Sequence, residues 1–147
     1  MVSYVDTSVL LPALSANHPL HASCLQLVRG ALTGGTVVST TLHTFAELYN
    51  HLTKPTKLNI HLPPPEVADL LLDRLPTSVQ FIDLQRQHYR AAIQRCARLQ
   101  LVSAIVYDAL HLEAALGAGA QVLYTHNTKD FYRLLTPEDN VRVQGIR

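Results

Sequence analysis

The beginning of the chain constrains its fold more than any other stretch. An apolar run at residues 2–5 ends at Asp6, and a second apolar run at residues 9–14 follows Thr7 and Ser8. Acidic and hydroxyl residues commonly begin helices, so this order predicts a strand, a cap at Thr7 or Ser8, and then a short helix. Ligands of open α/β sheets bind beyond the carboxyl ends of the strands, where loops and helix starts meet. Asp6 is therefore either an ordinary helix-starting residue or part of a functional site.

Strand-like and helix-like segments alternate along the rest of the chain. Apolar residues recur near helical spacing in residues 20–32, and the β-branched run at residues 36–41 is typical of a strand. A strand, a crossover helix and a second strand form one βαβ unit, in which the two strands are parallel. Similar patterns predict helices at 42–52, 66–75, 84–99 and 101–117, a helical turn at 132–135, and strands at 79–84, 121–125 and 141–143, the last at an edge.

The composition indicates one globular domain that spans residues 1–147. Hydrophobic residues make up 48% of the chain and charged residues 16%, which is typical of a globular and not of a disordered protein. A formal net charge of +1 argues against a protein that coats DNA through a strong positive field, although a local basic patch is compatible with it. Neither Cys24 nor Cys96 has the spacing of a disulfide scaffold or a zinc ribbon, and no stretch reaches the roughly 18 apolar residues of a membrane span. We therefore expect a soluble, cytoplasmic protein.

Four acidic residues follow predicted strands or lie early in the helices that come next. Asp6 ends the first strand, Glu47 and Asp108 lie near the starts of helices, and Asp130 follows the strand at 121–125. Each has an ordinary explanation, since a charged residue in a helix is usually only solvated. Asp108 is the least ordinary, because it stands in a mostly apolar helix and burying an unpaired carboxylate costs several kcal/mol. Parallel strands would bring all four acids to one sheet edge, where hard oxygen ligands suit Mg²⁺ or Mn²⁺.

Four segments of the sequence, in this order, resemble a known family. They are VDTSVL, FAEL, YDALHLEAA and YTHNTKDF, and together they are similar to the PIN domain and, at this length, to the VapC group of ribonuclease toxins from toxin–antitoxin pairs. The resemblance covers nearly the whole chain. It implies a three-layer α/β/α sandwich on a parallel central sheet, an endoribonuclease site that uses Mg²⁺ or Mn²⁺, an antitoxin partner and often a homodimer.

The resemblance also implies a role for each acidic position. Asp6, Glu47 and Asp108 would be the main catalytic and metal-binding acids, and Asp130 would be the fourth, acting directly or through water. Asn127 is the alternative for the polar group nearest the metal. The residues expected to support the site, by orienting a carboxylate or a water molecule, are Thr7, Ser8, Thr125 and Asn127. One departure is Ser103, which stands where many family members have glycine, so the shape of that loop is left undecided.

Basic residues are the candidates for holding an RNA backbone. Lys129 and Arg133 lie beside the fourth acid, and the helix predicted at 84–99 carries the arginines Arg86, Arg90, Arg95 and Arg98. The alternative for this helix is an ordinary solvated face. The eight histidines, His111 among them, show no zinc spacing with cysteine and are expected to be mostly packing or surface residues. His126 is the exception, because it adjoins the predicted site and could contact RNA or metal-bound water.

Other functions receive less support from the sequence. No G-x-S-x-G, G-x-G-x-x-G or G-x-x-x-x-G-K-[ST] segment is present, which argues against a serine hydrolase and against a nucleotide-binding fold. A magnesium-dependent phosphatase with Asp6 as its nucleophile typically carries a second aspartate two residues later, where this chain has Ser8. A non-catalytic PIN-like binding module would not need the four acids. For an antitoxin helix, the apolar faces of residues 20–32 and 42–52 are the expected docking surfaces.

Overall fold

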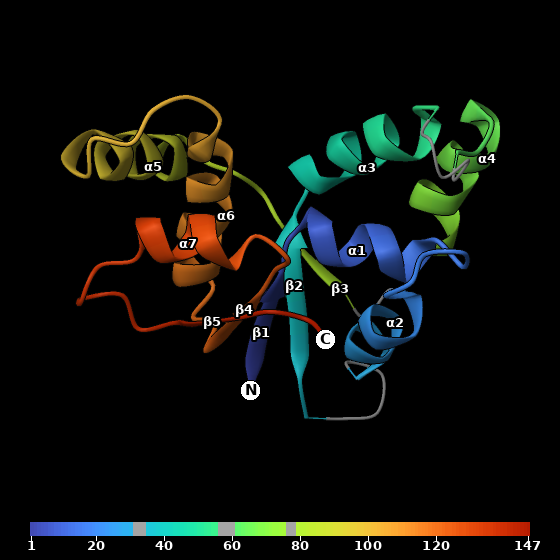
Figure 1. Ribbon diagram of the computed structural model, residues 1–147, viewed down its shortest axis with the longest axis horizontal. Coiled ribbons are helices and arrows are strands. Elements are labelled where there is room, and N and C mark those ends of the chain that lie inside the picture. Colours follow the sequence, from blue (N-terminus) through green and yellow to red (C-terminus); the bar gives the residue numbers. More distant parts are fainter. Residues whose placement is uncertain (31–34, 56–60, 76–78) are drawn as a thin grey trace.

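A five-stranded parallel sheet forms the centre of the molecule, in the strand order β3-β2-β1-β4-β5 (Figure 1). The computed structural model describes residues 1–30, 35–55, 61–75 and 79–147. The strands are β1 (Val2–Val5), β2 (Val37–Thr41), β3 (Val79–Ile82), β4 (Val122–Tyr124) and β5 (Arg142–Gln144). β1 lies in the middle, with Tyr4 in register with Ser39 of β2 and Leu123 of β4. The residue that follows β1 therefore emerges at the centre of the carboxyl edge.

Helices cover both faces of the sheet. On one side lie α1 (Thr7–Leu14), α2 (His21–Arg29), α3 (His43–Thr53) and α4 (Pro64–Asp69), which a π-helical segment at Leu70–Arg74 continues (Figure 1). On the other side lie α5 (Arg86–Arg98), α6 (Ile105–Gly117) and α7 (Thr128–Leu134). This is the predicted three-layer α/β/α sandwich, so the prediction of the fold class is confirmed. Within the described ranges, no helix is both long and apolar enough to cross a membrane.

The sheet separates two hydrophobic cores, because successive side chains of a strand point to opposite faces. In β1, Tyr4 packs into the core beneath α5, α6 and α7, whereas its neighbour Val5 packs into the core beneath α1 to α4. In β4, Leu123 and Tyr124 divide between the same two cores in the same way. The chain thus fixes the side of the sheet on which each strand residue lies.

The predicted elements are present, and several differ at their ends. α1 begins at Thr7 and not at residue 9, and α7 begins at Thr128, so the predicted turn at 132–135 starts too late. The helix predicted at 66–75 is formed by α4, which starts earlier at Pro64, together with the π-helical segment. Proline suits the first turn of a helix because the backbone N–H that it lacks has no partner there. α2 ends at Arg29, and residues 31 and 32 of the helix predicted at 20–32 lie outside the described residues.

The turn between α5 and α6 has the backbone shape that glycine favours. Ser103 adopts a left-handed conformation with φ 68°, and Gln100 adopts one with φ 53°. Such a conformation costs a residue with a Cβ atom roughly 1–2 kcal/mol. Ser103 therefore keeps the loop shape that a glycine would give, at a cost in stability.

Arg95 is buried and belongs to a structural ion network, so its prediction as part of a phosphate-contacting stripe is wrong. Only 5% of the residue is exposed. Its guanidinium donates to Glu113 of α6 at 2.6 Å, to Asp139 at 2.6 and 3.0 Å, and to the backbone carbonyl of Leu134 at 2.9 Å. These bonds join α5 to α6 and to the turn that follows α7. Arg86, Arg90 and Arg98 are exposed, as the prediction requires.

Candidate active site

Asp6 begins α1 at the centre of the carboxyl edge of the sheet. Its backbone is extended (φ −91°, ψ −179°), and its Oδ1 accepts a hydrogen bond of 3.0 Å from the backbone N–H of Ser8. This is the geometry of a helix N-cap. The prediction that Thr7 or Ser8 caps the helix is therefore wrong, and the cap is Asp6 itself.

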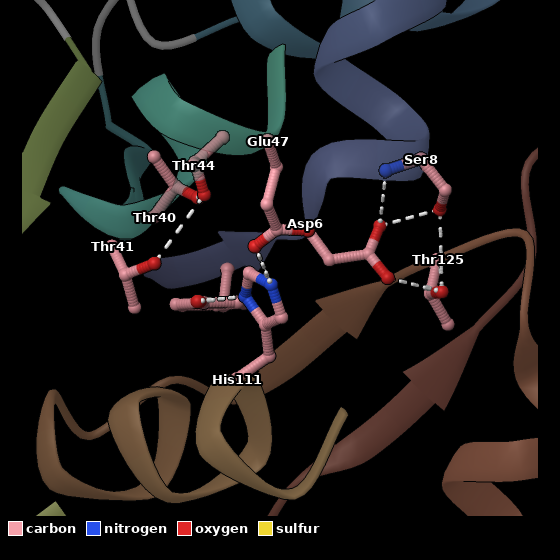
Figure 2. A network of polar contacts seen from close by, with 9 residues as sticks. Asp6, Ser8, Thr40, Thr41, Thr44, Glu47, His111 and Thr125 are labelled. Carbon is pink, nitrogen blue, oxygen red and sulfur yellow. Dashed lines mark hydrogen bonds and ion pairs between the residues drawn. The ribbon is translucent and has the colours of Figure 1, made fainter. Parts of the chain in front are cut away.

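Two hydroxyl groups also hold the Asp6 carboxylate (Figure 2). Ser8 Oγ donates to Oδ1, and Thr125 Oγ1, which follows β4, donates to Oδ2 at 2.6 Å. Each hydroxyl in turn accepts a backbone N–H at 2.9 Å, Ser8 from His126 and Thr125 from Asn127. The ends of β1 and β4 are thereby joined through one carboxylate. Burial raises the pKa of Asp6, and the charge of His111 and these hydrogen bonds offset only part of the rise.

Glu47 reaches the same region from α3. The start of this helix is attached to the end of β2 by Thr44, whose Oγ1 lies 3.0 Å from Thr40 Oγ1 and 3.3 Å from Thr41 Oγ1 (Figure 2). Glu47 comes three residues after Thr44 and therefore lies on the same side of the helix. The threonine contacts thus set where the Glu47 side chain begins.

The Glu47 carboxylate is hydrogen bonded to a buried histidine. Its Oε1 lies 3.2 Å from Nε2 of His111 on α6, and Nδ1 of the same ring lies 2.6 Å from the Tyr4 hydroxyl. Burial alone would raise the pKa of Glu47, but the hydrogen bond and charge of His111 lower it overall. The Thr7 hydroxyl lies near enough to contribute to this lowering, although it makes no hydrogen bond of normal geometry among the described residues. Glu47 is therefore ionised, and His111 on α6 stabilises its negative charge.

Asp108 occupies the first turn of α6, one turn before His111. Burial and then the charge of Asp6 raise its pKa to about 6, with smaller contributions from Asp130 and Glu47. His111 acts in the opposite direction. The charges of acids from separate elements therefore add to the effect of burial on Asp108.

These side chains line one cleft with a volume of about 260 Å³. Its lining consists of Asp6, Thr7, Ser8, Leu11, Glu47, His51, Asp108, His111 and Asn127. The contributing segments are the β1–α1 junction, α3, α6 and the β4–α7 junction, which are far apart in the sequence. Three carboxylates and an amide therefore face a common space at the carboxyl edge of a parallel sheet.

The sequence matches the model of one family, the PIN domain, over residues 3–134. The chain belongs to the PIN domain family. No curated protein matches the sequence significantly.

Solved structures of VapC and VapBC proteins share this PIN fold. VapBC2 from Rickettsia felis, bound to a DNA fragment from its promoter, is 21% identical over 100% of both chains, with a TM-score of 0.66. VapC20 from Mycobacterium tuberculosis, a toxin that cleaves the sarcin–ricin loop, is 20% identical over 95% of this chain and 98% of its own, with a TM-score of 0.67. DNA-bound VapBC from Salmonella typhimurium is 20% identical over 99% and 98% of the two chains, with a TM-score of 0.66.

Asp130, the fourth predicted acid, is not among the residues that line the cleft. Asp130 is half-exposed and faces Arg133 at 3.5 Å, whereas Asn127 is among the residues that line the cleft. The charge of Asp130 still contributes to the raised pKa of Asp108. Of these two residues, Asn127 is therefore the one that lines the cleft together with the three acids.

The other predicted contacts of the PIN domain lie outside the cleft. Lys129, Arg133, Arg86 and Arg90 are exposed and are absent from its lining. His126 is also absent from the lining, and its Nε2 lies 3.8 Å from the Cys24 sulfur. The burial of His126 lowers its pKa.

His111 and Tyr4 are the site residues that the sequence reasoning missed. A signal was present, because His111 follows Asp108 by three residues and so shares its helix face. Tyr4 precedes Asp6 by two residues on the strand and therefore points to the same side as Asp6 would in a continued strand. These two spacings indicate a functional role only once it is known that Asp6 and Asp108 line the same cleft.

The donors of the PIN domain cleft fit a hard divalent cation. The available ligands are carboxylate and amide oxygens, which Mg²⁺ and Mn²⁺ prefer. Burial and then the neighbouring carboxylates raise the pKa of Asp108, and a cation there would favour its ionised form. Within the described part of the chain, no three Asp, Glu, His or Cys side chains are already arranged to hold one ion.

Proposed function

We propose that this chain is a divalent-metal-dependent endoribonuclease and the toxin of a VapBC-type toxin–antitoxin pair. The observation that supports this most is the cleft, in which Asp6, Glu47 and Asp108 face one another from three separate elements. Burial and then the charges of the neighbouring carboxylates raise the pKa of Asp108 to about 6, and a bound cation would favour its ionised form. The similarity of the fold to VapC20, which cleaves an RNA loop, gives the substrate class.

Asp6, Glu47 and Asp108 would hold Mg²⁺ or Mn²⁺, with Asp130 or Asn127 contributing directly or through water. When bound, such an ion supplies an activated water for in-line attack on a phosphodiester and charge stabilisation for the leaving oxygen, which leaves a 5′-phosphate on one product. Ser8 and Thr125 hold the Asp6 carboxylate in a fixed orientation toward the cleft. The chain's own contribution is thus the placement of negative charge and the restraint of its rotamers.

Exposed basic residues around the cleft would hold the RNA backbone. Lys129 and Arg133 stand on α7, and Arg86 and Arg90 stand on the early turns of α5. Each would contact a phosphate as a solvated charge, so their contribution should weaken as salt is added. They would position RNA without selecting its sequence.

The proposed partner is a small antitoxin, since VapBC2 of Rickettsia felis and VapBC of Salmonella typhimurium were solved as VapBC proteins. The outer faces of α2 and α3 are the proposed docking surfaces, and Tyr49 on α3 is a large apolar side chain left exposed there. Coexpression with the adjacent reading frame should yield a stable complex. A homodimer is also proposed, and light scattering of the purified protein tests it.

Replacement of Asp6 by asparagine tests the nuclease directly. Asparagine caps helices as well as aspartate does, so Asp6→Asn should retain the fold while it removes the charge and replaces one acceptor oxygen by an N–H donor. We expect wild type to cleave RNA with Mg²⁺ or Mn²⁺ and Asp6→Asn to be inactive, whereas the exposed control Asp73→Asn should behave as wild type. If Asp6→Asn cleaved as fast as wild type, the assignment of the metal site would be wrong.

Two further measurements separate the alternatives. Absence of divalent binding at millimolar metal would indicate a non-catalytic PIN-like module. Release of phosphate from small phosphomonoesters without RNA cleavage would indicate a phosphatase. Sequencing the ends of RNA cut after induction of the protein would identify the RNA target.

A further inference from the structure

The cleft acids differ in how firmly they are held. Asp6 is short and receives hydrogen bonds from the Ser8 backbone, the Ser8 hydroxyl and the Thr125 hydroxyl. Glu47 reaches the cleft through a longer side chain, 28% of which is exposed. Fixing such a side chain in one rotamer costs conformational entropy. A neighbouring side chain that is itself rigid would hold the Glu47 carboxylate in one orientation.

His111 is such a partner. The residue is only 5% exposed, and its Nε2 lies 3.2 Å from Glu47 Oε1 (Figure 2). Its Nδ1 lies 2.6 Å from the Tyr4 hydroxyl. The Tyr4 ring also packs edge-on against the imidazole, with centroids 5.8 Å apart. Tyr4 is itself fully buried in the central strand. The imidazole can therefore neither flip nor tilt without breaking a buried contact.

The direction of the hydrogen bond to Glu47 follows from chemistry. An ionised carboxylate only accepts hydrogen bonds, so Nε2 of His111 must carry a hydrogen and donate it. If the ring is neutral, Nδ1 accepts from Tyr4; if it is charged, Nδ1 donates to the phenolic oxygen instead. The contact with Glu47 is the same in both states.

We propose that His111 is a positioning residue of the cleft, which, anchored by Tyr4, holds the Glu47 carboxylate in the orientation that binds the divalent metal. This inference rests on the proposed function, because it assigns Glu47 to a metal. α6 would then supply both a metal-binding acid, Asp108, and the residue that positions Glu47, His111, which lie one turn apart on this helix. Groups that orient a metal ligand in this way commonly change metal affinity by 10–100-fold when they are replaced.

A matched pair of variants tests the proposal. In His111→Gln the amide nitrogen can occupy the place of Nε2 and still donate to Glu47, whereas in His111→Asn the shorter amide reaches only the place of Nδ1, beside Tyr4. Mn²⁺ is titrated into the metal-free full-length proteins by calorimetry. Glutamine keeps the donor to Glu47 but lacks the nitrogen that Tyr4 anchors, so His111→Gln should bind Mn²⁺ more weakly than wild type but more tightly than His111→Asn, which should bind about 10–100-fold more weakly than wild type.

A purely structural role predicts another outcome. Both substitutions replace a buried ring by a smaller amide, so their losses of melting temperature should be similar. Equal Mn²⁺ affinities for the two variants would therefore overturn the proposal. If His111→Asn does not fold, Tyr4→Phe takes its place, because it removes the hydroxyl that anchors Nδ1 and keeps the aromatic ring. A loss of Mn²⁺ affinity supports the proposal, and an unchanged affinity overturns it.

A double-mutant cycle with Glu47→Gln separates this proposal from the proposed function. If His111 acts through Glu47, His111→Asn should have little further effect on Mn²⁺ affinity in a Glu47→Gln background. If Glu47→Gln alone leaves Mn²⁺ binding and RNA cleavage unchanged, the proposed metal site fails. If Glu47→Gln weakens binding and the effect of His111→Asn simply adds to it, only the positioning role fails.

Discussion

Replacement of Asp108 by asparagine should stabilise the metal-free protein at neutral pH. The pKa of Asp108 is raised to about 6 because the residue is buried and lies near other carboxylates. A carboxyl group with a raised pKa holds its proton more tightly in the folded than in the unfolded protein. Stability therefore falls as the pH rises from the ordinary aspartate pKa to about 6, and above that the whole penalty is present. Asparagine cannot ionise and avoids this penalty.

The magnitude follows from the size of the shift. A rise from 3.8 to about 6 corresponds to about 3 kcal/mol as an upper limit. Asp108 is only partly buried, and solvent screening should reduce the effect to about 1–2 kcal/mol. For a chain of this length, that is a rise in melting temperature of about 3–6 °C. The difference should shrink toward zero below about pH 4, where the carboxyl group is protonated in both states.

Thermal unfolding in EDTA from pH 4 to pH 8 provides the assay. Asp108→Asn should melt higher than wild type at pH 8 and by a much smaller margin at pH 4, and added Mg²⁺ should raise the melting temperature of wild type more than that of the variant. Asp73→Asn, an exposed change outside the cleft lining, is the control and should show neither effect. Equal stability of Asp108→Asn and wild type at pH 8, or a difference that does not vary with pH, would refute the reasoning that burial and the neighbouring carboxylates penalise the charge of Asp108.

Three other changes test separate parts of the structure. Arg95→Lys keeps the buried charge but loses the paired hydrogen bonds to Asp139, and should lower the free energy of unfolding in urea by about 3 kcal/mol. The pKa of Asp139 is lowered because the hydrogen bonds and charge of Arg95 outweigh the effect of burial, so this loss should diminish as the pH falls below about 4. Ser103→Gly should raise the melting temperature by relieving the left-handed backbone at φ 68°, whereas Ser103→Ala should not. Replacing both Arg86 and Arg90 by glutamine should reduce the slope of log affinity against log salt by about 1.4 for a non-cleavable single-stranded RNA and leave stability unchanged.

The sequence predicts the alternation of strands and helices well, because each short apolar run and each helical stripe is a local pattern. The start of α7 also has a local signal, since Asn127 and Asp130 are typical of a helix start and of a first turn, although the helical turn is predicted only at 132–135. The role of Arg95 depends on Asp139, which lies far along the chain, so no local pattern reveals it. Its position in line with the buried Ala92 and Cys96 on α5 is the one local signal.

The acidic residues of the candidate site could be predicted from the sequence, but the residues that contact and orient these acids could not. Asp6, Glu47 and Asp108 follow from their places relative to strands, because parallel strands bring such places to one edge. His111 was expected to be an ordinary packing residue, and in isolation that expectation is reasonable for a histidine in an apolar helix. Its function depends on contacts with β1 and α3, which are set by how three layers pack and not by any motif.

The carboxylate of Asp6 is positioned by its role as the N-cap of α1. A helix N-cap needs an extended backbone and a side-chain oxygen that accepts a hydrogen bond from the first turn, and Asp6 Oδ1 meets this need through the Ser8 backbone. Its second oxygen is then free to meet Thr125 from the neighbouring strand. The cap therefore fixes the carboxylate at the centre of the sheet edge, so helix start and candidate ligand are one structural feature. Glu47 lies within α3 and has no such cap to orient it. Its carboxylate is instead hydrogen bonded to His111, whose ring is held by Tyr4 of the central strand.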